Sequence, residues 1–320
     1  MRKIIYTLTA ILLMSKLLFS QDYAKVDRIV QNYARSFSSP DKLAKQINKD
    51  FTLPTEKARA IYTWIALHIK YDIEALRRPQ KRTSFSYRTL EEKAQKEREI
   101  MEGIAKQTLK KKKAVCQGYS SLYKLLCDLS SIECEIITGF AKINKRDIGR
   151  LPRGSNHAWN AVRINNEWKL IDVTWGAGYI NENSSQFTPD FKEHYFFLSP
   201  EKFVLKHYPE DKAWLFTTIS ANQFAKLPLF FSSYFDSNIE IVKPNNGIIK
   251  AGKTINFKVK NLGNDTLTFK FDYERNSQRI KPKQVNGFSI FEIEHKRNVN
   301  TYLTVFRNRR AFAKFKISKR

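Results

Sequence analysis

Two alternating segments joined by a turn-forming dipeptide constrain this fold more than any other feature of the sequence. Residues 158–164 and 168–173 alternate in character with a period of two, which is typical of strands that bury one face. Asn165-Asn166 lies between them, and Asn tolerates the positive φ angles that a two-residue hairpin turn requires. The pattern therefore predicts an antiparallel hairpin.

This hairpin is expected to place two polar residues on one face of the sheet. The turn sets Ile164 opposite Glu167, and Asp172 then falls opposite Trp159. His157 shares a face with Trp159, because side chains alternate along a strand. His157 and Asp172 are thus diagonal neighbours, within reach of each other. A slip of one residue would separate them onto opposite faces, so the register is a decisive expectation.

Cys116 is the third polar residue of interest, at the first turn of a predicted helix. Residues 117–129 carry apolar side chains at helical spacing. A helix N-terminus presents unpaired N–H groups and a partial positive charge, which favour thiolate over thiol. The lysines at 111–113 add positive potential, and Gly118 allows a close approach of backbone or substrate. Cys116 is therefore a candidate nucleophile.

Together these three residues fit cysteine acyl-transfer chemistry. Cys116 would attack a carboxamide or peptide carbonyl, His157 would carry the proton to the leaving amine, and Asp172 would orient His157. The backbone N–H of Cys116 is the expected oxyanion donor, and the sequence assigns no second donor. No cofactor is expected, and no cysteine spacing predicts a metal site. Further candidates for oxyanion or cleft contacts are Gln117, Trp159 and Trp175.

Three ordered segments resemble the core motifs of the transglutaminase-like superfamily. They are Cys116 to Ser120, Asn156 to Asn160, and Trp168 to Trp175. Flanking segments at 58–65 and 197–214 resemble, more narrowly, the kyphoscoliosis-peptidase branch. The resemblance covers roughly residues 50–216. It implies an α+β papain-like fold in which a helix carries Cys116 and an antiparallel sheet carries His157 and Asp172, and it implies these three as nucleophile, base and acid.

The remaining pattern predicts two structural domains. Residues 21–225 are expected to form the transglutaminase-like domain, with a basic loop at 73–88. From residue 236, short alternating segments separated by Asn and Gly turn signals are typical of an immunoglobulin-like β-sandwich over 236–320. Helical spacing in the first domain predicts helices within 22–49, broken at Pro40, and at 55–71 and 89–112.

The first twenty residues are typical of a secretory signal peptide. A basic start at residues 2–3 precedes a mostly apolar stretch, and Lys16 argues against a spanning helix. The sequence therefore predicts a secreted or periplasmic protein, with an uncleaved membrane anchor as the alternative. The three cysteines leave at least one thiol unpaired, and whether Cys127 and Cys134 form a disulfide stays open.

The charge of the chain bears on its partners. The net charge is +26, and residues 236–320 hold 19 Lys and Arg against 7 Asp and Glu. In an exported protein this excess favours an anionic surface such as cell wall or lipid, and specific nucleic-acid binding is not expected. Solubility alone is the simpler account of the same charge.

Two hypotheses of function remain. The first is a secreted cysteine peptidase, amidase or transamidase that acts on peptide or carboxamide bonds of proteins. The second is a non-catalytic extracytoplasmic interaction protein that binds through the same cleft and the basic β-domain. The presence of all three polar residues in order favours the enzyme. Hydrolysis and transamidation are not separated, because the outcome depends on whether water or an amine reaches the acyl-enzyme.

Overall fold

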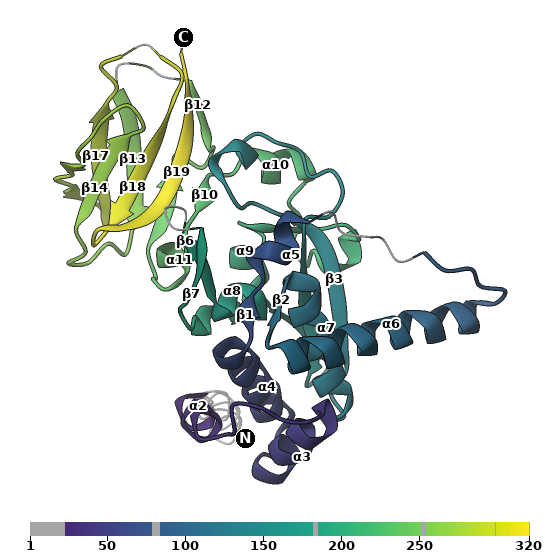
Figure 1. The fold of residues 1–320 in the computed structure, drawn as a ribbon. Helices are drawn as coiled ribbons and strands as arrows, with labels where there is room; N and C mark the ends of the chain where they lie inside the picture. Colours follow the sequence, from purple (N-terminus) through teal and green to yellow (C-terminus); the bar gives the residue numbers. More distant parts are fainter. Residues whose placement is uncertain are drawn as a thin grey trace, which may run out of the picture.

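The computed structural model describes residues 23–78, 84–181, 185–250, 252, 254–297 and 299–319. A core of helices and sheet is followed by a β-sandwich at the C-terminal end (Figure 1). The predicted signal peptide, residues 1–20, lies outside the described residues. Within the described part of the chain, no helix combines the length and apolarity needed to cross a membrane.

Three helices open the described chain: α2 (Tyr23–Gln31), α3 (Pro40–Asp50) and α4 (Pro54–His68). The predicted break at Pro40 is confirmed, because Pro40 is the first residue of α3. The Ser39 side chain caps this helix by accepting a hydrogen bond from the Lys42 N–H. α4 packs against both α2 and the helix that carries Cys116, so it lies at the centre of the helical half of the core.

The chain enters the Cys116 helix through a short parallel ladder. α6 (Leu90–Lys111) projects from the core (Figure 1) and ends at Lys112, whose φ is +51°. This left-handed residue turns the chain into β2 (Lys113–Ala114), which pairs with β1 (Lys70–Tyr71). α7 (Cys116–Asp128) begins two residues after β2. The ladder therefore fixes the start of α7.

The prediction of a basic loop over residues 73–88 is wrong at its start. The chain there forms a short helix, α5 (Ile73–Arg77). The Asp72 side chain caps it by accepting a hydrogen bond from the Ala75 N–H at 3.0 Å. Five residues are too few for a helical period to show in the sequence, so only the cap could have indicated this helix.

A five-stranded antiparallel sheet forms the other half of the core, in the order β8-β5-β4-β3-β9. The predicted hairpin register is confirmed, because Ile164 pairs with Glu167. Asn165 and Asn166 have φ angles of +51° and +64°, as the tight turn requires. The strands are β3 (Cys134–Ala141), β4 (His157–Ile164), β5 (Glu167–Ile171), β8 (Phe196–Leu198) and β9 (His207–Pro209).

α7 packs against this sheet and buries an apolar face. Tyr119, Leu122 and Leu126 have no exposed surface, and burial of each such side chain contributes roughly 1.5–3 kcal/mol. From β4, Asn160 Nδ2 donates to the Ser120 carbonyl of α7 at 3.1 Å. Helix and sheet are thus held in one relative position. This is the predicted fold, with a cysteine-bearing helix on an antiparallel sheet.

Short elements connect β3 to β4 and β5 to the C-terminal strands. β6 and β7 form an antiparallel hairpin of their own. The connecting elements are η1 (Lys145–Asp147), α8 (Val173–Ala177), β6 (Gly178–Asn181), β7 (Gln186–Pro189), η2 (Glu193–Tyr195), α9 (Pro200–Phe203), η3 (Lys212–Trp214), α10 (Ala221–Lys226) and α11 (Ser232–Phe235).

The C-terminal strands form two sheets with the immunoglobulin arrangement. One sheet has the order β11-β13-β17-β16, and the other contains β19-β18-β14, with β15 beyond β14. β10 (Leu229–Phe230) joins β19 from a position before the predicted start at residue 236. The remaining strands are β11 (Glu240–Lys243), β12 (Ile248–Lys250), β13 (Thr254–Lys260), β14 (Leu267–Phe271), β15 (Gln278–Arg279), β16 (Lys283–Val285), β17 (Phe288–Glu294), β18 (Thr301–Arg307) and β19 (Arg310–Ser318).

Candidate active site

Cys116 is the first residue of α7 and is partly exposed. The preceding residue, Val115, offers no side-chain cap, and the Gly118 and Tyr119 N–H groups already bond to the Val115 carbonyl. The N–H groups of Cys116 and Gln117 lie at the very start of the helix, where no carbonyl of the preceding turn is available. The thiol therefore stands in the positive end of the helix dipole, beside backbone donors.

His157 and Asp172 meet as the hairpin register predicted. His157 Nε2 lies 2.7 Å from Asp172 Oδ2, and both side chains are buried. The strand ends earlier than expected, at Ile171, so Asp172 is the N-cap residue of α8. Its Oδ1 accepts the Trp175 N–H at 3.0 Å. The cap fixes the carboxylate, so Asp172 occupies one ring nitrogen of His157, and the His157 side chain acts on the Cys116 thiol and lowers its pKa.

The charges of the three groups reinforce one another. Burial raises the pKa of the Cys116 thiol, but the hydrogen bond with His157 and the His157 charge outweigh it, and the pKa lies below its usual value. Burial lowers the pKa of His157, but Asp172 and then Cys116 raise it to about 10. Burial likewise opposes ionisation of Asp172, yet His157 and His207 hold its pKa below the usual range. The favoured state is thiolate beside imidazolium beside carboxylate.

A second histidine, His207, contacts the same carboxylate. Its Nε2 lies 2.9 Å from Asp172 Oδ2, and the residue is buried at the start of β9. Sequence reasoning missed it as a site residue. The only available signal was its position in the His207-Tyr208-Pro209 segment, a strand of three residues whose pairing with β3 has no local pattern.

The three further candidates from the sequence have different environments. Trp175 is half-buried and stacks on His157, with ring centroids 5.0 Å apart. Trp159 is 1% exposed, so it belongs to the core and not to a cleft wall, which corrects that prediction. The Gln117 side-chain amide is directed along α7 towards Ser121 Oγ at 3.5 Å, so only its backbone N–H fits an oxyanion role.

His157, Asp172 and His207 also present three potential metal-ligand atoms within 4.8 Å of one another. Among the described residues this is the group whose geometry could accommodate a metal ion. The two imidazole nitrogens are, however, already directed at one carboxylate oxygen at hydrogen-bond distances. Hydrogen bonds therefore account for the arrangement without an ion.

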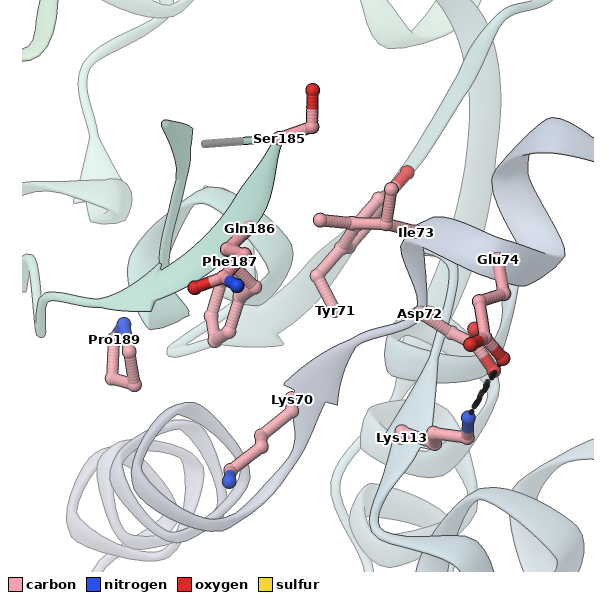
Figure 2. A pocket seen from close by; sticks show the side chains of 10 residues that line it. All are labelled: Lys70, Tyr71, Asp72, Ile73, Glu74, Lys113, Ser185, Gln186, Phe187 and Pro189. Carbon is pink, nitrogen blue, oxygen red and sulfur yellow. Dashed lines mark ion pairs between the residues drawn. The ribbon is translucent and has the colours of Figure 1, made fainter. Parts of the chain in front are cut away.

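A pocket of about 300 Å³ lies between the β1–β2 ladder and the β6–β7 hairpin. Figure 2 shows Tyr71 and Ile73 on one side and Gln186 and Phe187 across from them. Both walls continue from the site, because β2 leads into Cys116 and β6 follows α8, which Asp172 caps. Burial, followed by the charges of Cys116 and Asp172, raises the pKa of Tyr71. The pocket is thus electrostatically coupled to the site.

The charged groups of this pocket sit at its rim. Lys113 Nζ lies 3.6 Å from both Asp72 and Glu74, so one cation is shared by two carboxylates at that end (Figure 2). Lys70 also lines the pocket and is exposed, and it has no ion pair among the described residues. The floor between them is largely apolar and aromatic.

Comparisons with known proteins show which sequences this chain is similar to. Residues 41–173 match the transglutaminase-like superfamily. The chain is 29% identical over 241 residues to kyphoscoliosis peptidase of Homo sapiens, covering 74% of this chain and 33% of that protein. The protein of the same name from Mus musculus is 28% identical, covering 69% and 31%. The chain thus spans about a third of the length of these relatives. A solved structure described as a TGase shares 17% identity, covering 60% of this chain and 43% of the other, with a TM-score of 0.30.

Proposed function

Because residues 41–173 form a transglutaminase-like domain of the kyphoscoliosis-peptidase-like branch, we propose that this chain is a cysteine enzyme acting on peptide or carboxamide bonds of proteins. The observation that carries the proposal is the thiolate-stabilising arrangement at Cys116. A partly exposed thiol with a lowered pKa stands at a helix N-terminus, beside an imidazole that is itself bound to a buried carboxylate. A purely structural cysteine needs none of these features.

The proposed reaction has two stages. The Cys116 thiolate attacks the carbonyl carbon, and the carbonyl π electrons move to oxygen, where the Cys116 N–H and the Gln117 N–H are positioned as donors. The tetrahedral intermediate then collapses, the C–N bond breaks, and the His157 imidazolium gives its proton to the departing amine. A thioester on Cys116 results.

In the second stage an incoming nucleophile attacks the thioester. Neutral His157 takes its proton, the C–S bond breaks, and the thiolate–imidazolium pair is restored. Water yields a carboxylic acid, and an amine yields a new amide. Asp172 keeps its charge throughout and holds the imidazole in one orientation. The same residues therefore support a peptidase, an amidase or a transamidase.

We place the substrate next to Cys116, along the Tyr71–Phe187 pocket. Its apolar floor suits a large aliphatic or aromatic side chain, and Lys70 at the rim suits a neighbouring acidic residue of the substrate. The coupling of Tyr71 to Cys116 supports this placement. A substrate strand in this position would present its carbonyl to the thiol from the exposed side.

The test is an activity screen of the chain lacking residues 1–20, with Cys116→Ala as the matched control. Peptide hydrolysis, ammonia release from glutamine-containing proteins, and incorporation of a labelled primary amine are measured side by side. Turnover that vanishes in Cys116→Ala supports the proposal, and the response to added amine separates hydrolysis from transamidation. Turnover that persists in the variant, or its absence across all three assays, rejects the enzyme and favours a binding role for the cleft.

Export remains part of the proposal because of the signal-peptide pattern at residues 1–20. A fusion of these residues to a reporter that is active only outside the cytoplasm tests it. Reporter activity equal to that of a leaderless control would reject export.

A further inference from the structure

Asp172 Oδ2 is shared by two imidazoles. His157 Nε2 lies 2.7 Å from this oxygen, and His207 Nε2 lies 2.9 Å from it. His157 comes from β4 and His207 from β9, on either side of β3. The reaction proposed above needs one histidine, so the second requires its own account.

The surroundings of His207 are aromatic and closed. The residue is 1% exposed, and its ring stacks on Phe203 with centroids 4.0 Å apart. Trp175 lies 4.4 Å away, and Trp159 packs edge-on at 5.1 Å. Such a cage leaves the ring one orientation and no contact with water. His207 is therefore a fixed group that substrate does not reach.

Both nitrogens of His207 face acceptors. Nε2 faces the Asp172 carboxylate, and Nδ1 lies 3.2 Å from the Phe203 carbonyl. Burial lowers the pKa of His207 to about 4, so the ring is neutral near pH 7 and carries one proton. The Asp172 carboxylate is charged and closer than the Phe203 carbonyl, so it is the stronger hydrogen-bond acceptor. The proton consequently lies on Nε2, and His207 donates to Asp172.

We propose that His207 is a positioning residue that donates its Nε2–H to Asp172 Oδ2, holds the carboxylate in place, and limits the proton affinity that Asp172 confers on His157. A carboxylate that already accepts a fixed hydrogen bond attracts the His157 proton less strongly. His157 then releases its proton to a leaving amine more readily. The effect on catalysis rests on the proposed function, whereas the hydrogen bond from His207 to Asp172 does not.

Other ionisable groups also face this site. Tyr62 from α4, Tyr71 from β1 and Tyr195 from η2 lie near Asp172, and burial raises the pKa of each above its usual value, so all three stay neutral. Burial lowers the pKa of Lys206 to about 8, and its Nζ lies 4.1 Å from the Trp175 ring. Lys206 therefore titrates in the relevant range, and Lys206→Met is a necessary control.

The first experiment needs no variant and no activity. The protein is labelled with ¹⁵N in its histidine rings, of which there are five in the chain, and titrated by NMR from about pH 5 to about pH 11, so that the range includes the His157 pKa of about 10. We expect His207 to remain the neutral Nε2–H tautomer throughout. An Nδ1–H tautomer, or a doubly protonated ring at neutral pH, would overturn the proposal.

The second experiment compares His207→Gln, whose amide can still donate to Asp172, with His207→Phe, which fills the cage without a donor. Loss of a hydrogen bond to a charged group changes an equilibrium by about tenfold. We expect the His157 titration to move up by about one pH unit in His207→Phe and to stay near wild type in His207→Gln and Lys206→Met. If the His157 pKa is the same in His207→Gln and His207→Phe, the role of His207 is merely structural.

Turnover adds a separate readout. With a substrate in hand, His207→Phe should lower kcat by about tenfold, leave KM unchanged, and move the basic limb of the pH profile upward. If the chain proves to have no activity, the proposed function fails while the NMR results still decide the position of the His207 proton. If His207→Phe does not fold, the wild-type tautomer alone decides the donor.

Discussion

Two buried aspartates of this molecule show how partners decide the role of a carboxylate. Asp27 is bound by Arg59 Nε at 2.9 Å and by Thr63 Oγ1 at 2.6 Å. A permanent cation thus neutralises it, and the contact ties α2 to α4. Asp172 is bound instead by two imidazoles and a backbone N–H. Its charge is available to raise the proton affinity of His157, because no lysine or arginine of the described residues forms an ion pair with it.

Cys116 is expected to be the reactive thiol. Its lowered pKa keeps thiolate present as the pH falls below the range of an ordinary cysteine, where only about 1% or less of a free thiol is ionised at pH 6. At pH 6 we expect iodoacetamide to modify it roughly tenfold or more faster than free cysteine. Peptide mapping identifies the site. Cys127 and Cys134 are free but buried, and faster modification of either one in the folded protein would contradict the assignment.

Asp172→Asn should remove this advantage without changing the shape of the site. The amide oxygen can still accept the Trp175 N–H, but the negative charge that stabilises imidazolium is lost, so the His157 pKa falls. We expect alkylation of Cys116 at pH 6 to slow by roughly tenfold or more. Asp27→Asn is the matched control, since it also neutralises a buried carboxylate. It should lower stability by roughly 3–5 kcal/mol and leave Cys116 reactivity in the folded protein intact. Equal losses of reactivity in both variants would refute the specific role of Asp172.

At the scale of elements, the sequence carried the information for the hairpin but not for β9. The Asn165-Asn166 turn and the strand alternation are local, so the register of Ile164 with Glu167 could be predicted. The pairing of His207 with Ala141 joins positions far apart in the chain through a three-residue strand. Three residues are too few to show a strand periodicity, so neither β9 nor the role of His207 was predicted. The end of β5 was also not predicted. Asp172 and Val173 continue the alternating pattern in the sequence, but in the structure Asp172 leaves the sheet and caps α8.

Gly118 sets how closely α7 approaches the end of α6. A Cβ at this position would lie 2.5 Å from Thr108 Oγ1 and would also overlap the Ala114 side chain. Gly118→Ala should therefore displace the start of α7 at a cost of about 1–3 kcal/mol. We expect Cys116 alkylation to slow at least tenfold, because the thiol moves away from His157.

Gly103→Ala provides the matched control for Gly118→Ala. Gly103 lies within α6, and a Cβ there meets no atom within 4 Å. The substitution should stabilise the helix by up to about 1 kcal/mol and leave alkylation unchanged. Unchanged Cys116 reactivity in Gly118→Ala, or reduced reactivity in Gly103→Ala, would show that this approach does not position the thiol.

At the scale of the whole molecule, the sandwich and the core are joined near the site. Phe235 of α11, the connecting helix that packs on β19, contacts the Tyr195 ring at 6.1 Å, and the Tyr195 carbonyl accepts the Asp172 N–H at 3.0 Å. Lys145 Nζ lies 2.5 Å from Asp272 of the sandwich. The boundary between the two domains was predicted from composition, which carries no information about contacts between them. Removal of the sandwich would therefore deprive β10 and α11 of their contacts with β19, and its function is better tested in the full chain.

The ionic contacts of the sandwich leave its positive charge largely uncompensated. Residues 236–320 contain 7 acidic residues, and at least five of them already form ion pairs: Asp236, Glu240, Asp265, Asp272 and Glu294. The same segment holds 19 basic residues. Arg279, Lys281 and Lys283 are exposed within five positions of one another, at β15 and β16. These three form the basic cluster that we expect to contact an anionic surface.

The full chain should therefore bind anionic lipid vesicles at low salt and release them at high salt. Each basic residue near such a surface contributes about 1 kcal/mol, so replacing the three residues of the basic cluster with Glu should weaken binding about 100-fold or more. Replacing Lys42, Lys45 and Lys49 of α3, which are also exposed, changes the net charge equally and serves as the control. Binding is measured by vesicle co-sedimentation at about 0.1 M and about 1 M salt, between which the screening length falls from about 10 Å to about 3 Å. Equal weakening by the two triple variants would assign the attraction to net charge alone, and binding that persists at 1 M salt would exclude an electrostatic contact.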